Sequence, residues 1–156
     1  MQSLIKDINL AAEGRKKIDW VSNFMPTLNT LGDRFEAKQT FKGQTIVVSV
    51  HLEAKTAYLA TVLKRGGADV IVTGSNPLST QDDVAAGLVD MGITVYAWYD
   101  CTDEEYFDFL HKALDHKPHI IIDDGGDLVN LLHTTRQDAK ERLIGGSEET
   151  TTGVHR

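Results

Sequence analysis

The chain has 156 residues, of which 41% are hydrophobic, and it carries 16 lysines and arginines against 23 aspartates and glutamates. This size fits one domain with a sizeable core, and the net charge of −7 disfavours unspecific attraction to nucleic acid or anionic membranes. No apolar stretch approaches the roughly 20 residues of a membrane span, and residues 1–17 carry charges where a signal peptide would be apolar. We therefore expect a cytoplasmic domain that binds a small molecule, with no role in binding nucleic acid or a membrane.

The first 40 residues predict a helical lead-in. Apolar residues over 4–24 recur mostly at three-to-four spacing, which is typical of an amphipathic helix. Pro26 interrupts this pattern, and a second short helix is expected over 27–37.

Residues 41–146 predict a parallel α/β core. Runs rich in β-branched residues are typical of strands buried on both faces, and they lie at 45–50, 69–73, 93–97 and 119–123. Helical patterns occupy 52–65, 80–91 and 103–116, and 142–146 is a candidate fifth strand. This alternation predicts a three-layer, Rossmann-like or flavodoxin-like open parallel sheet with helices on both faces. Gly66, Gly67 and Gly92 stand where the caps of helix C-termini belong.

Polar residues follow the strands of this predicted sheet. In open α/β sheets ligands bind outside the carboxyl ends of the strands, so we expect the polar side chains there to converge on one crevice. These side chains are His51 after the first strand, Ser75, Asn76 and Ser79 after the second, Asp124 and Asp127 after the fourth, and Glu149, Thr150, Thr151 and Thr152 after the fifth.

His51 and Asp124 are the candidates for proton transfer. His51 precedes a helix, whose positive end favours the neutral imidazole that a general base needs; a histidine hydrogen-bonded to backbone at a strand end is the alternative. Adjacent side chains of an extended segment point to opposite sides. One carboxylate of the pair Asp123 and Asp124 should therefore face the crevice while the other braces the backbone, and we favour Asp124 for the crevice. Asp127 either contributes to the site or caps the helix that follows.

Simpler structural roles explain several other polar residues. Ser75, Asn76 and Pro77 are typical of a turn, with Ser79 or Thr80 as the N-cap of the next helix. Cys101, the lone cysteine, cannot form an internal disulfide and reads as a small, partly buried residue. No His/Cys spacing is typical of zinc, so no metal is expected. Neither G-x-G-x-x-G nor G-x-x-x-x-G-K-[ST] occurs.

Four motifs carry a family resemblance: "NPLSTQDDVAA", "VYAW", "DDGGDL" and "SEETTTGVH". In order and spacing they resemble the adenosylhomocysteinase (S-adenosylhomocysteine hydrolase) family, over residues 6–156. Members of that family are more than twice this long, so the resemblance is to their N-terminal, substrate-binding portion, with 147–156 starting the connection to an NAD-binding domain. It implies a homotetrameric parent enzyme whose NAD, catalytic lysine and catalytic aspartate are held beyond residue 156. The 156 residues alone are expected to be inactive.

The resemblance also implies residue roles. The family oxidises the ribose 3′-hydroxyl of a nucleoside thioether with tightly held NAD, which permits elimination of homocysteine. By resemblance His51 and Asp124 would be the acid and base near the 4′ and 5′ positions, and Glu149 would bind the ribose hydroxyls. Thr150, Thr151 and Thr152 would touch NAD. The implied substrate-binding residues are Glu53, Lys55, Thr56, Ser75, Asn76, Ser79 and Asp127.

One departure from the family pattern concerns the purine. Where familiar members read H-M-T-V-E-T, residues 51–56 read H-L-E-A-K-T, so Glu53 and Lys55 replace a purine-facing threonine and glutamate. Lysine can only donate hydrogen bonds, which suits the 6-oxo group of hypoxanthine; our hypothesis is that S-inosylhomocysteine is accepted. Glu53 retains an acceptor, so the order of preference stays open. Two alternatives remain: a flavodoxin-like receiver that binds magnesium, and a nucleoside-binding module without catalysis.

Overall fold

The computed structural model describes residues 2–156 and contains one five-stranded sheet in the order β3-β2-β1-β4-β5. All four strand pairs are parallel, which confirms the predicted α/β fold with an open parallel sheet. The strands are β1 (Thr45–Ser49), β2 (Asp69–Thr73), β3 (Thr94–Tyr96), β4 (Ile120–Asp123) and β5 (Gly145–Glu148).

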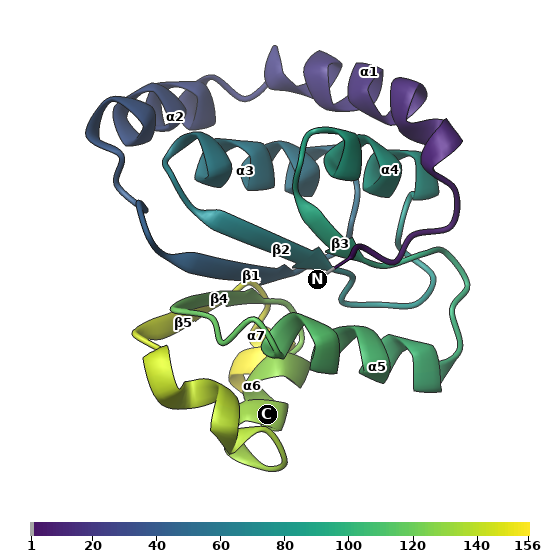
Figure 1. Cartoon of the computed structure of the whole chain (residues 1–156), viewed down its shortest axis with the longest axis vertical. Coiled ribbons are helices and arrows are strands. Elements are labelled where there is room, and N and C mark those ends of the chain that lie inside the picture. Colours follow the sequence, from purple (N-terminus) through teal and green to yellow (C-terminus); the bar gives the residue numbers. More distant parts are fainter. Residues whose placement is uncertain (1) are drawn as a thin grey trace.

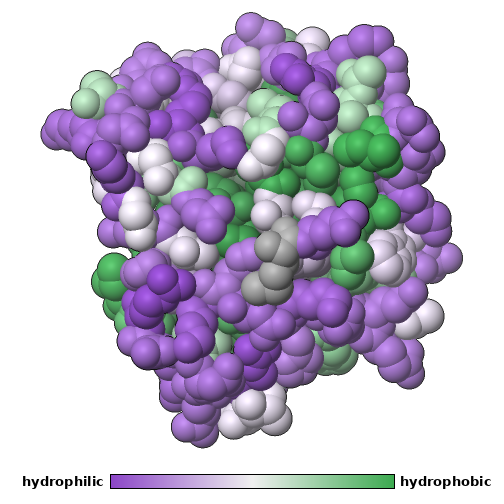
Figure 2. Space-filling model, in the orientation of Figure 1, coloured by the Kyte–Doolittle hydropathy of each residue, from purple (hydrophilic) through white to green (hydrophobic). Residues whose placement is uncertain are grey.

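Helices cover both faces of the sheet, and each face has its own apolar cluster (Figure 1). One face carries α1 (Ala11–Ser22), α2 (Pro26–Lys38), α3 (Ala54–Arg65) and α4 (Asp82–Asp90). The other carries α5 (Asp103–Leu114), α6 (Asp127–His133) and the 3-10 helix η2 (Gln137–Arg142), while α7 (Thr151–Val154) follows β5. Figure 2 shows a mostly hydrophilic surface with a hydrophobic area around α4. Across residues 2–156, no helix has the length and apolar character needed to cross a membrane.

The helix layer above the sheet contains a backbone-to-backbone contact between α1 and α4. A β-carbon built on Gly14 would lie 1.7 Å from the carbonyl oxygen of Asp83, and one on Gly87 would lie 2.9 Å from the backbone nitrogen of Arg15. Only glycine fits such an approach without moving the helices apart. These two glycines therefore set how closely α1 packs on α4, and hence on the sheet beneath.

The helix predicted over 4–24 begins later than expected. Leu4 is extended and pairs with the edge strand β3, because its N–H donates to the carbonyl of Val95 at 2.8 Å and its carbonyl accepts from Ala97 at 3.1 Å. A 3-10 turn, η1 (Ile8–Leu10), with Asp7 as its N-cap, leads into α1. Covering the edge of a sheet competes with helix formation here, and the apolar spacing alone did not show it.

The start of β5 and the N-cap of α4 also differ from the prediction. The fifth strand exists but starts at Gly145 instead of 142, because the preceding residues coil into η2. The N-cap of α4 is Gln81, which makes no side-chain cap hydrogen bond, and not Ser79 or Thr80. The glycine caps were placed correctly: Gly66 is the C-cap of α3, and Gly67 and Gly92 have positive φ angles of 94° and 76° just past helix ends.

Candidate functional site

The carboxyl ends of four strands lie side by side in one row. In the sheet register Ser49 pairs with Thr73 on one side and with Asp123 on the other, and Asp123 pairs with Glu148. The chain segments that leave these four strands therefore start from the same edge of the sheet. We call this edge the strand-end rim; it comprises residues 49–56, 73–79, 123–127 and 148–152.

His51, Asp124 and Ser75 meet at this rim although they come from three different segments. His51 Nε2 lies 3.5 Å from Asp124 Oδ2, and the Ser75 hydroxyl donates to the same oxygen at 3.0 Å. The Asp124 side chain is only 9% exposed while that of His51 is 55% exposed, so the carboxylate is fixed and the imidazole faces solvent. Such a pair can pass a proton between a bound molecule and the protein.

Asp123 has the other role expected of the acid pair. It is completely buried, and its carboxylate accepts hydrogen bonds from the backbone N–H of Asp124 at 3.1 Å and of Val129 at 3.0 Å. Burial raises the pKa of Asp123 to about 6, although these two N–H groups oppose the shift. Asp123 therefore braces the loop between β4 and α6, and Asp124 faces His51.

A cavity of about 600 Å³ opens beside this cluster. Its walls are mostly apolar and come from the junction of α1 and α2, from α3 and from the ends of β1 and β4. Its polar lining is Thr27, Lys55, Thr56 and Glu149. A largely apolar cavity with a few polar groups is the usual form of a small-molecule site. Its volume and its place beside the rim make it the candidate binding site.

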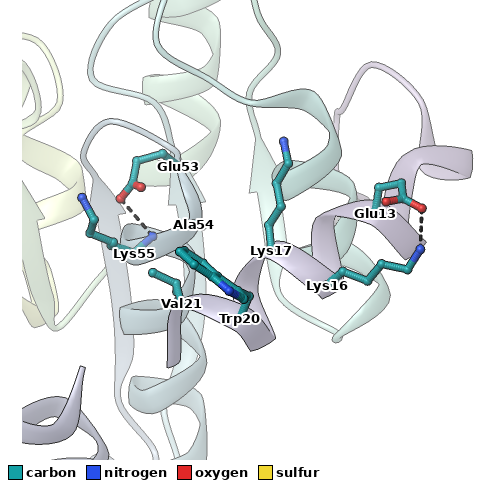
Figure 3. Close-up of a pocket in the computed structure, with 8 residues that line it drawn as sticks. All are labelled: Glu13, Lys16, Lys17, Trp20, Val21, Glu53, Ala54 and Lys55. Carbon is teal, nitrogen blue, oxygen red and sulfur yellow. Dashed lines mark hydrogen bonds and ion pairs between the residues drawn. The ribbon is translucent and has the colours of Figure 1, made fainter. Parts of the chain in front are cut away.

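A second cavity, of about 510 Å³, lies between α1 and the start of α3 (Figure 3). Glu149 lines the first cavity and not the second, whereas His51 and Asp124 line neither. Glu53 belongs to this second cavity, where its carboxylate turns back to cap α3 by accepting from the N–H of Lys55 at 2.9 Å and of Thr56 at 3.1 Å. Figure 3 shows the Lys55 side chain extending away from Trp20. The structure thus separates Glu53 from the candidate binding site while Lys55 lines both cavities.

The other residues singled out from the sequence hold the rim together. Asn76 Oδ1 accepts from the N–H of Leu78 at 2.8 Å, and the Ser79 hydroxyl donates to the Asn76 carbonyl at 3.0 Å, which makes a tight turn. Asp127 is the first residue of α6 and not its N-cap, which is Gly126. Its carboxylate accepts from the Tyr106 hydroxyl at 3.0 Å and pairs with Arg156 at 2.9 Å.

Comparison with known proteins identifies the family. The family described as S-adenosyl-L-homocysteine hydrolase matches residues 2–144. The chain belongs to this family. It is 55% identical over 152 residues to the S-inosyl-L-homocysteine hydrolase of Methanocaldococcus jannaschii, covering 97% of this chain and 37% of that protein. It is 56% identical over 152 residues to the adenosylhomocysteinase of Pyrococcus abyssi, covering 97% and 36%. The chain therefore spans a little over a third of the length of these relatives.

Membership of the S-adenosyl-L-homocysteine hydrolase family agrees with the resemblance found in the sequence and replaces the receiver interpretation. In the part of the chain that the structure describes, no three His, Cys, Asp or Glu side chains gather as a metal site requires. The lone thiol, Cys101, is buried, and burial raises its pKa, which makes it a poor nucleophile.

The sequence analysis did not single out Glu148, the residue before Glu149. Its Oε1 accepts from the N–H of Gly125 at 2.8 Å and of Thr150 at 3.1 Å. Its Oε2 is buried and has no partner among residues 2–156. A β-carbon on Gly153 would lie 2.3 Å from this carboxyl group, so only glycine leaves it room. The alternation rule applied to Asp123 and Asp124 would have found Glu148, since it too is the inner acid of a pair that ends a strand.

Proposed function

We propose that the full-length protein, by which we mean this chain within a protein of its relatives' length, hydrolyses an S-nucleosyl-homocysteine thioether at the strand-end rim. This chain would supply the substrate-binding domain, with the nucleoside in the 600 Å³ cavity. The observation that carries the proposal is the contact of His51 with Asp124 at 3.5 Å beside that cavity. The names of the relatives, which include both adenosyl and inosyl hydrolases, support it.

In this proposal the rim residues have separate roles. Asp124, fixed by Ser75, and the solvent-facing His51 would move protons at the sugar carbon and at the leaving sulfur. Glu149 lines the cavity, as Thr56 does, and its carboxylate would accept hydrogen bonds from the ribose hydroxyls. The backbone of Glu149 is tied to the adjacent strand end, because its N–H donates to the Asp123 carbonyl at 2.9 Å. All three groups thus stand on segments anchored in the sheet.

Thr150, Thr151 and Thr152 fit a role in holding NAD. Thr151 and Thr152 are exposed, and Thr150 makes no side-chain cap hydrogen bond at the start of α7, so their hydroxyls are free to contact a polyhydroxylated group. When bound, NAD would supply the oxidation of the ribose 3′-hydroxyl and its later reversal. We further expect the full-length protein to be a homotetramer, which light scattering on the purified protein would test.

We infer that the purine would lie beside Lys55, which favours a 6-oxo group. Lys55 lines the cavity and can only donate hydrogen bonds, while the carboxylate of Glu53 is occupied in capping α3 outside it. The carboxylate of Glu53 therefore lies outside the cavity proposed for the nucleoside. This difference favours S-inosylhomocysteine over S-adenosylhomocysteine as the substrate.

The test is turnover of the two thioethers by the full-length protein. We expect a higher kcat/KM for the inosyl compound, and we expect Lys55→Glu to shift the ratio towards the adenosyl compound by about 10- to 100-fold, because a carboxylate accepts from the 6-amino group. Lys42→Glu makes the same change of charge at an exposed position outside both cavities and should leave the ratio unchanged. A large adenosyl preference in the unaltered protein would reject the inosyl assignment, and turnover of neither thioether would reject the function.

A further inference from the structure

Tyr106 lies at the base of the rim, although it belongs to α5 on the opposite face of the sheet from α3. It is 6% exposed. Its hydroxyl oxygen lies 3.2 Å from the carbonyl oxygen of Ser75 and 3.0 Å from Asp127 Oδ2. One buried hydroxyl thus touches the segment that leaves β2 and the helix that follows β4.

Ser75 connects this hydroxyl to the proposed proton-transfer pair. The backbone carbonyl of Ser75 faces Tyr106, while its side-chain hydroxyl donates to Asp124 at 3.0 Å. Asp124 in turn lies 3.5 Å from His51. The direction of the Ser75 hydroxyl depends on the orientation of the Ser75 backbone. A hydrogen bond donated to the Ser75 carbonyl therefore also affects the position of the Asp124 carboxylate.

The Tyr106 hydroxyl is a permanent donor. Burial raises its pKa strongly, and the negative charges of Asp127 and Asp123 add to the effect. The phenol therefore keeps its proton over the whole range in which an enzyme works. The phenol has a single proton, which the Ser75 carbonyl and the Asp127 carboxylate share as acceptors at 3.2 and 3.0 Å.

We propose that Tyr106 is a positioning residue for the His51 and Asp124 pair: its hydroxyl fixes the backbone of Ser75, and Ser75 then holds Asp124 against His51. Tyr106 lines neither of the two cavities described above and acts only through Ser75. This inference rests on the proposed function for its kinetic consequence, whereas its structural part concerns the fixed position of Ser75 and Asp124.

The kinetic test is a double-mutant cycle of Tyr106→Phe and Ser75→Ala in the full-length protein. Tyr106→Phe removes the hydrogen bond to the Ser75 carbonyl, and Ser75→Ala removes the one to Asp124. We therefore expect each change to lower kcat about 5- to 10-fold with little change in KM. Because Tyr106 acts through Ser75, the double variant should be no slower than the slower single variant. Multiplied losses in the double variant would show that Tyr106 acts independently of Ser75, which overturns the inference.

Tyr96→Phe is the matched control. Tyr96 is 1% exposed, packs in the same apolar cluster as Tyr106, and has a hydroxyl 3.0 Å from His116 Nε2. His116 lies past the last residue of α5, whereas Tyr106 lies near the start of that helix. Both changes should lower the midpoint of thermal unfolding by a similar amount, but only Tyr106→Phe should lower kcat. Equal kcat values in the two variants would overturn the inference.

A second readout separates this inference from the proposed function. In 1H–13C correlation spectra of the 156-residue chain, we expect the ring signal of His51 to move in Tyr106→Phe and in Ser75→Ala, and to stay in place in Tyr96→Phe. This shift requires no turnover. If the full-length protein hydrolyses neither thioether but the His51 signal moves as described, the function fails and the positioning role stands. An unmoved His51 signal in Tyr106→Phe refutes the positioning role whatever the activity.

Discussion

The strand-end rim and the helix layer of α1 and α4 are built on opposite principles. The layer joins two helices through glycine backbones and apolar side chains, with its charges at the surface, as in the pair of Arg15 and Asp90. The rim gathers carboxylates at one edge of the sheet and keeps at least two of them buried or nearly so, Asp123 and Asp124. Burying like charges costs free energy. The layer therefore stabilises the fold, and the rim uses part of that stability to hold reactive groups in place.

The sharpest way to test this division is Asp124→Asn. Asparagine keeps the shape of the side chain and can still accept from Ser75, but it cannot exchange a proton. In the full-length protein we expect kcat to fall by about 10²- to 10⁴-fold, while the free energy of unfolding changes by about 1 kcal/mol or less. The measurements are steady-state kinetics and urea unfolding.

Asp90→Asn, in the helix layer of α1 and α4, is the control for Asp124→Asn. The Asp90 side chain is 47% exposed and pairs with Arg15 across α1 and α4, so its loss should change neither activity nor stability by much. If Asp124→Asn retained more than a tenth of the kcat, its assignment to proton transfer would be wrong.

The converse experiment is Gly14→Ala in the helix layer. A methyl group there would stand 1.7 Å from the Asp83 carbonyl oxygen, so α1 and α4 must separate, at a cost of about 3 kcal/mol in the free energy of unfolding. Gly32→Ala in α2 provides a comparison, because its β-carbon would meet only the movable end of Arg65 at 3.0 Å and Val62 at 3.4 Å. Both substitutions gain about 1 kcal/mol of helix propensity, so the difference between them measures the clash. Equal urea midpoints for the two variants would disprove the tight crossing.

The same contrast explains which features could be predicted from the sequence. Continuous β-branched runs are a clear sequence sign of buried strands, and all four predicted strands are present, with no end shifted by more than one residue. The glycine crossing was not predictable, because Gly14 lies inside an ordinary amphipathic pattern and nothing local shows that another backbone will approach it. Leu4 at the sheet edge is similar, since its partner Tyr96 is 92 residues away in the chain.

At the rim, the sequence predicted which acids lie at strand ends but not all of their partners. The alternation of side chains predicted that one acid of the pair braces the backbone, and this acid is Asp123; Asp124, the acid favoured for the site, lies beside His51. The hydroxyl of Tyr106 reaches the rim from the far side of the sheet, and the helix that carries it gives no local sign of this contact. The capping role of Glu53 was likewise missed, although an acid just before a helix is typical of an N-cap.

The free energy that it costs to bury the Asp123 carboxylate at the rim can be measured through the pH dependence of stability. The pKa of Asp123 is about 6 in the folded chain against an ordinary value of 3.8, so between these values the folded state binds more protons than the unfolded state. The contribution of Asp123 to stability is therefore fully present below pH 3.8, falls as the pH rises, and levels off above about 6. A shift of about two pKa units corresponds to at most about 3 kcal/mol.

Asp123→Asn isolates this contribution from that of the other carboxylates. The variant has one acceptor oxygen in place of two, so it loses a hydrogen bond to Asp124 or Val129 at a cost that is the same at every pH. The stability advantage of the unaltered chain over the variant should thus shrink by up to about 3 kcal/mol between pH 4 and pH 7, as followed by urea unfolding at half-unit steps. A constant difference would mean that Asp123 ionises in the folded chain as easily as in water, and that the rim does not impose the cost that its burial implies.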